Sequence, residues 1–106
     1  MLYEMRVYEH VEGQAEAVRQ RFESEVIPRL AKHGIELLGV FIEPQTGHLT
    51  YLTRFANEEA RKAAWASFSA DAEWKAVKAA SEVNGPLIAR QVASVLNPIV
   101  SGLTLS

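Results

Sequence analysis

The first ten residues alternate between apolar and polar side chains, reading Leu-Tyr-Glu-Met-Arg-Val-Tyr-Glu-His over residues 2–10. A period of two with aromatic and branched residues predicts a β-strand. Tyr3, Met5 and Val7 share its apolar face. If that face packs on helices, Glu4 and Arg6 point away from them, toward the interior of a barrel or the sheet side of a pocket.

The pattern changes to a period of four over residues 14–33, which predicts a helix with one apolar face. The residues on that face are Val18, Phe22, Val26 and Leu30. Gly34 suits the left-handed position after the helix, and His33 places positive charge at its C-terminal end. Pro28 removes a backbone donor inside the helix, so we expect a kink near Ser24 and Glu25.

The remaining chain has two strands joined by a short turn, two alanine-rich helices and a last strand. We expect these elements at residues 35–43, 48–55, 57–69, 71–83 and 87–96. The short turn makes the first two strands an antiparallel hairpin. We expect Asp71 to cap the second alanine-rich helix. The tail from about residue 97 carries no clear element.

The order β-α-β-β-α-β predicts an α+β, ferredoxin-like fold in a single domain over residues 1–106. Its four-stranded antiparallel sheet has helices on one face only. Strand 35–43 is apolar on both faces, with one set at Leu38, Val40 and Ile42 and the other at Leu37, Gly39 and Phe41. We therefore expect a homodimer in which a second copy covers the open face.

Composition narrows the classes of function. The chain has no cysteine, which excludes disulfides and thiolate metal sites and fits a cytoplasmic location. Its net charge of −2 and the lack of a basic cluster argue against nucleic acid as a partner. The longest apolar run, residues 37–42, is far shorter than the about 20 residues that span a membrane.

The chain resembles the NIPSNAP family of the dimeric α/β barrel superfamily over about residues 3–98. The matching positions are Tyr3 to Tyr8, Pro28, His33-Gly34, Gly47, Arg54-Phe55, Glu59 to Arg61, Trp65, Phe68, Asp71, Glu73-Trp74 and Pro98. Ala72 stands where the family commonly has proline. The resemblance implies two ferredoxin-like protomers whose sheets form a barrel. The wider superfamily includes cofactor-free monooxygenases and isomerases, but NIPSNAP members have no agreed reaction.

The first strand carries the candidate catalytic residues, Glu4, Arg6 and Tyr8, with Arg54 expected nearby. A carboxylate and a guanidinium two residues apart on a buried face must neutralise each other or a ligand. One interpretation is therefore an anion-binding or proton-transfer site. The alternative is a structural ion pair, in which case Arg6→Ala would orphan Glu4 and cost about 3–5 kcal/mol of stability.

Aromatic and hydroxyl groups complete the candidate pocket. We expect Tyr51, Arg54, Trp65 and Trp74 to bind a small apolar or aromatic ligand between sheet and helices, although Trp65 and Trp74 also suit core packing. No histidine has metal-ligand spacing and no glycine-rich phosphate loop is present, so we expect no metal and no cofactor. A haem ligand from His10 or His48 is an alternative. The sequence predicts a cofactor-free binder or enzyme, monooxygenase- or isomerase-like, or else a non-catalytic homodimeric assembly protein.

Overall fold

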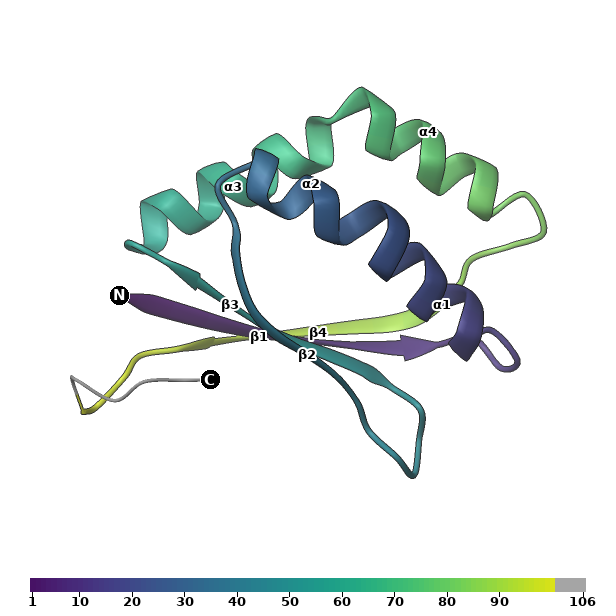
Figure 1. The fold of residues 1–106 in the computed structure, drawn as a ribbon, viewed down its shortest axis with the longest axis horizontal. Helices are drawn as coiled ribbons and strands as arrows, with labels where there is room; N and C mark the ends of the chain where they lie inside the picture. Colours follow the sequence, from purple (N-terminus) through teal and green to yellow (C-terminus); the bar gives the residue numbers. More distant parts are fainter. Residues whose placement is uncertain (101–106) are drawn as a thin grey trace.

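A computed structural model describes residues 1–100 and confirms the predicted order of elements (Figure 1). The strands are β1 (Leu2–His10), β2 (Glu36–Ile42), β3 (Leu49–Phe55) and β4 (Ile88–Leu96). The helices are α1 (Ala15–Arg21), η1 (Phe22–Val26), α2 (Ile27–Lys32), α3 (Glu58–Ala70) and α4 (Ala72–Ser81). No helix among these is long and apolar enough to cross a bilayer. Of the predicted tail, residues 101–106 lie outside the described part.

The four strands form one antiparallel sheet in the order β2-β3-β1-β4, which is the ferredoxin-like arrangement that the sequence predicted. Figure 1 shows every helix on the same side of this sheet. The central strands β1 and β3 pair Glu4 with Thr53 and Arg6 with Tyr51. These pairs lie beneath the helices and position the site described below.

The first helical segment is continuous but changes its winding at the predicted place. Its middle, η1, is a π-helical turn that includes Ser24 and Glu25, and Pro28 follows it in the first turn of α2. A π-helix turns more slowly per residue than an α-helix. This local widening lets apolar residues four positions apart keep one face, and each is at most 5% exposed: Val18, Phe22, Val26 and Leu30.

The Tyr3, Met5 and Val7 face of β1 does not pack on the helices, so the condition under which Glu4 and Arg6 would point away from them is not met. The opposite face packs on the helices: Leu2 is 8% exposed and Glu4 is not exposed at all. The apolar face of β1 is the open face of the sheet. A charged pair is tolerated under the helices because those helices supply its hydrogen-bond partners, as the site shows.

The predicted faces of β2 also need a correction. Leu37 pairs with Thr53 and Val40 with Tyr51, so both face the core although three positions separate them. A β-bulge at Leu38 accommodates the extra residue. Phe41 stays on the open face and is 60% exposed.

The two alanine-rich helices begin at the predicted polar caps. The Asn57 side chain accepts a hydrogen bond from the Ala60 amide at 2.8 Å, and Asp71 accepts one from the Trp74 amide at 3.0 Å. Asp71 both follows α3 and precedes α4, so this one residue marks the corner between the helices.

Candidate functional site

A pocket of about 380 Å³ lies between the helices and the β1–β4 side of the sheet. Its walls combine aromatic and charged side chains. They include Arg6, Tyr8, Arg21, Phe22, Trp65, Phe68, Trp74, Lys78, Glu82 and Arg90. A volume of this size is within the range of small-molecule sites.

Glu4 anchors the floor of the site. Its carboxylate is fully buried and accepts three hydrogen bonds: from Trp65 Nε1 at 2.6 Å, Arg61 Nη1 at 3.2 Å and Arg6 Nε at 3.3 Å. The Thr53 hydroxyl donates to the backbone carbonyl of Glu4 at 3.1 Å. A buried carboxylate with three donors is satisfied and fixed in place, so Glu4 orients Arg6 and Trp65.

Arg6 is held on two sides. Its guanidinium carbon lies 3.7 Å from the centroid of the Trp65 ring, a cation–π contact, while its Nε donates to Glu4. Neither Nη group donates to a carboxylate or carbonyl within residues 1–100. The free edge of a rigid guanidinium at a pocket wall is suited to receive a ligand oxygen.

A second guanidinium enters from the helical side. Arg21, at the end of α1, has a side chain only 7% exposed and donates to Ser81 Oγ and Glu82 Oε2, each at 2.9 Å. Its guanidinium carbon lies 5.4 Å from the centroid of the Trp74 ring. Arg21 therefore joins α1 to the end of α4 and forms one wall of the pocket.

Two tyrosines share a hydrogen bond at the pocket floor. The Tyr8 and Tyr51 hydroxyl oxygens are 2.7 Å apart, and Tyr51 is fully buried whereas Tyr8 lines the pocket. Burial raises the pKa of both phenols, that of Tyr51 well above its ordinary value. Both are therefore neutral near pH 7. Because no other acceptor meets the Tyr51 hydroxyl within residues 1–100, Tyr51 donates to Tyr8, and the Tyr8 hydrogen remains for a ligand.

The apolar walls are aromatic and in mutual contact. Phe68 packs on Trp65 and Trp74, with ring centroids 5.8 and 5.3 Å apart, and Phe22 lies 6.2 Å from Tyr8. Such rings offer flat surfaces to a planar ligand. The chain has two tryptophans, and both line this pocket.

The structure brings most predicted site residues together. Glu4, Arg6, Tyr8, Trp65 and Trp74 gather at or beneath the pocket, and Tyr51 lies directly behind Tyr8.

The expected position of Arg54 near these residues is wrong. It pairs with Glu36 on the open face of the sheet, at 2.9 and 2.5 Å, because β3 alternates and its core face belongs to Thr53 and Phe55.

Sequence reasoning missed Arg21, Lys78 and Glu82. The signal for Arg21 was present, since it lies three residues after Val18 and next to Phe22, on the apolar face of the helix. A charged side chain on a buried helix face needs a polar or oppositely charged partner. Lys78 and Glu82 carry no comparable signal, because an exposed face of α4 would hold the same residue types.

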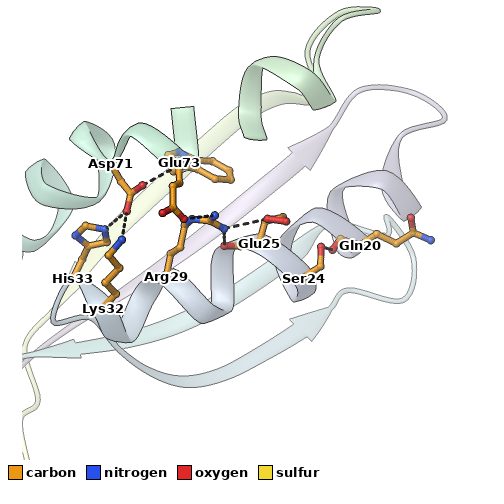
Figure 2. A network of polar contacts seen from close by, with 9 residues as sticks. Gln20, Ser24, Glu25, Arg29, Lys32, His33, Asp71 and Glu73 are labelled. Carbon is orange, nitrogen blue, oxygen red and sulfur yellow. Dashed lines mark hydrogen bonds and ion pairs between the residues drawn. The ribbon is translucent and has the colours of Figure 1, made fainter. Parts of the chain in front are cut away.

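A second polar network ties the helices together outside this pocket (Figure 2). His33 contacts Ser67 Oγ through Nδ1 at 2.6 Å and Asp71 Oδ2 through Nε2 at 2.7 Å, and Lys32 Nζ lies 3.4 Å from the same oxygen. The pKa of Asp71 is lowered, first by the Trp74 amide and then by His33 and Lys32. Asp71 therefore joins the end of α2 to the corner between α3 and α4.

His10 and His48 also lie outside the pocket. Their ring centroids are 5.5 Å apart at the strand ends, in an edge-to-face arrangement. No group of three His, Asp or Glu side chains within residues 1–100 is arranged as metal ligands.

Comparison with known proteins agrees with the fold. A family model described as NIPSNAP matches residues 3–101. An uncharacterized NIPSNAP domain protein from Burkholderia xenovorans is 19% identical with a TM-score of 0.82, covering 98% of this chain and 100% of its own. A NIPSNAP-like domain protein from the same organism is 25% identical with a TM-score of 0.79, covering 99% and 90%.

The same fold extends to a more distant structure. A monooxygenase from the gene ActVA-Orf6 of Streptomyces coelicolor, in complex with the ligand nanaomycin D, is 12% identical with a TM-score of 0.60, covering 97% of this chain and 91% of its own. At this identity the likeness concerns the fold alone. No curated protein matches the sequence.

Proposed function

The chain belongs to the NIPSNAP family, and we propose that it binds a small aromatic molecule in the pocket between its sheet and its helices. The observation that carries this proposal is a cavity of about 380 Å³ whose walls hold aromatic rings, the guanidiniums of Arg6 and Arg21, and the Tyr8 hydroxyl. Apolar walls with a few placed polar groups are typical of small-molecule sites. A structure of this fold that holds nanaomycin D supports the proposal.

The chemistry that we propose for the site is stabilisation of an oxyanion without a cofactor. Neutral Tyr8 donates a hydrogen bond, and the Arg6 guanidinium supplies positive charge beside it. An enolate or phenolate bound there is lowered in energy. Isomerisation of an enolisable ligand needs this step together with proton transfer, and cofactor-free oxygenation needs it together with dioxygen. Glu4, which has no exposed surface, is a positioning residue in this proposal.

The test uses the two tryptophans as reporters. Binding of 2-naphthol or 1,4-naphthoquinone should quench their fluorescence saturably and raise the melting temperature, since a ligand stabilises by RT ln(1 + [L]/Kd). Ser69→Phe, which adds a ring at a pocket-lining position, should weaken both signals. Ala66→Phe, at an exposed position of the same helix, should leave them intact. Absence of saturable binding, or equal binding by Ser69→Phe, would refute the proposal.

A second function, homodimeric assembly, is favoured by a separate surface. The open face of the sheet is largely apolar and no helix in the described chain covers it. Its apolar residues are Tyr3, Met5, Val7, Phe41, Leu52, Val92 and Leu96. We propose that a second copy packs on this face. Dimerisation is compatible with ligand binding, because the pocket lies on the other face.

A further inference from the structure

We infer that the ligand of this pocket is an aromatic monocarboxylate whose carboxylate is held by Arg6, beside Tyr8 and Arg21. This inference rests on the proposed binding function and names its ligand class. Three observations lead to it: the free edge of Arg6, the convergence of donors at Tyr8, and the balance of charge around the pocket.

The first observation is that Arg6 is pre-organised. Stacking on Trp65 and the hydrogen bond from Nε to Glu4 fix the plane of the guanidinium. Within residues 1–100 the two Nη groups donate no hydrogen bond. Parallel Nη–H groups match the two oxygens of a carboxylate, and a fixed plane reduces the entropy lost on binding.

The second observation is that three donors converge. Arg6, Arg21 and Tyr8 line the same pocket; burial raises the pKa of Tyr8, and the positive charges of the two guanidiniums act against this effect. Tyr51 already donates to Tyr8, which leaves the Tyr8 hydrogen free. A ligand oxygen at this point meets two cations and one hydroxyl donor, an arrangement that favours an anion over a neutral group.

The third observation sets the charge of the ligand. Four cations lie at or beneath the pocket: Arg6, Arg21, Arg61 and Lys78. Three carboxylates pair with the arginines: Glu4, Glu58 and Glu82. Lys78 has no carboxylate partner within residues 1–100. One positive charge remains in excess, although the whole chain has a net charge of −2. A single negative charge on the ligand balances the site, as a carboxylate does and a phosphate monoester dianion does not.

The experiment compares three naphthalenes by isothermal titration calorimetry on the wild-type protein. 2-Naphthoate should bind about ten- to a hundredfold more tightly than naphthalene-2-carboxamide, which has the same shape without the charge. 2-Naphthyl phosphate should bind no more tightly than 2-naphthoate. Equal or tighter binding of the amide overturns the inference but leaves the binding function intact, as does tighter binding of the phosphate. Failure of all three to bind overturns the binding function itself.

Variants assign the preference to Arg6. Arg6→Lys keeps the charge but loses the planar pair of donors, so it should weaken 2-naphthoate binding about tenfold and change amide binding little. Arg19→Lys, at a surface position paired with Glu16 and Glu23, is the matched control and should bind both compounds as wild type does. If Arg6→Lys keeps the full preference for 2-naphthoate, Arg6 does not hold the carboxylate.

Discussion

At the scale of single residues, Glu4 shows how a buried charge can be retained in a small core. An isolated carboxylate without exposed surface would be strongly disfavoured. Here two guanidiniums and an indole N–H surround it, and they come from β1 and from α3. The carboxylate thereby links the sheet to the helix that carries one wall of the pocket.

This arrangement lowers the expected cost of removing Arg6. Because Trp65 and Arg61 still donate to Glu4, Arg6→Ala should destabilise by about 1.5–3 kcal/mol, the range for one lost hydrogen bond to a charged group. The sequence-based expectation of about 3–5 kcal/mol assumed an orphaned carboxylate.

Removal of both arginines should be worse than additive. In Arg6→Ala/Arg61→Ala only the neutral Trp65 N–H remains, so urea denaturation should show a coupling beyond the sum of the single effects. Strictly additive losses would mean that the two guanidiniums do not share Glu4.

Asp71 predicts a specific dependence of stability on acid. Its pKa is lowered in the folded protein, so its charge stabilises the fold above its ordinary pKa of 3.8, and this contribution is lost as pH falls toward the lower folded value. Asp71→Asn can still cap α4 but lacks the charge. The stability gap between wild type and Asp71→Asn should therefore be present at neutral pH and close progressively below about pH 4.

Urea titrations between about pH 2 and pH 7 measure that gap. Glu59→Gln, at an exposed position in the first turn of α3 that makes no ion pair within residues 1–100, is the control. If the difference in unfolding free energy between wild type and Asp71→Asn is the same at low pH, the charge of the Asp71 carboxylate does not stabilise the fold.

Residue-level contacts were the part of the site that the sequence could not supply. The alternation of β1 identified Glu4, Arg6 and Tyr8 as sharing a face, but not which face meets the helices. The choice of face depends on Trp65 and Arg61, which donate to Glu4 and lie 61 and 57 residues after it in the chain. Hydrophobicity alone favoured Tyr3, Met5 and Val7 for the core, because it takes no account of a specific partner for a carboxylate.

At the scale of elements, local chemistry made the boundaries predictable. Asn57 and Asp71 cap their helices, and Gly34 has φ of +76° after α2, as the sequence indicated. The bulge in β2 escaped prediction for a physical reason. Leu37 and Leu38 are both leucine, so no polar residue marks the position at which the alternation slips.

That bulge gives a prediction at the same scale. Deleting Leu38 removes the unpaired residue and leaves Leu37 and Val40 on the core face, so the variant should fold with a modest loss of stability. Deleting Thr50 from the regular strand β3 shifts its alternation by one, which turns core residues such as Leu49 or Tyr51 outward.

Urea denaturation and circular dichroism distinguish these two deletions. The Leu38 deletion should keep a cooperative transition, whereas the Thr50 deletion should lose it. If both deletions abolish the cooperative transition, the bulge is required for the fold rather than tolerated by it.

At the scale of the whole molecule, the two faces of the sheet differ in what lies against them. One face meets the helices and carries the pocket. On the other face, a groove of about 470 Å³ is lined by Tyr3, Leu52 and residues 96–100. Ile99 is 98% exposed and Leu96 42% exposed. A contiguous exposed apolar surface is characteristic of an interaction surface.

The proposed homodimer makes this separation testable. Leu52 lies on central strand β3 and points to the open face, so Leu52→Glu would bury two like charges in the interface and should give a monomer at micromolar concentration. Val83→Glu replaces an apolar residue that is 77% exposed at the end of α4, away from the sheet, and should leave the dimer intact. Sedimentation equilibrium gives the masses, and the wild-type interface should exceed about 1,200 Å².

Ligand binding then separates the two proposed functions. One chain supplies every described residue of the pocket, and the pocket lies across the sheet from Leu52. Monomeric Leu52→Glu should therefore bind 2-naphthoate as tightly as wild type. A wild-type monomer would refute the assembly. A monomeric variant that has lost binding would show that the second copy completes the pocket.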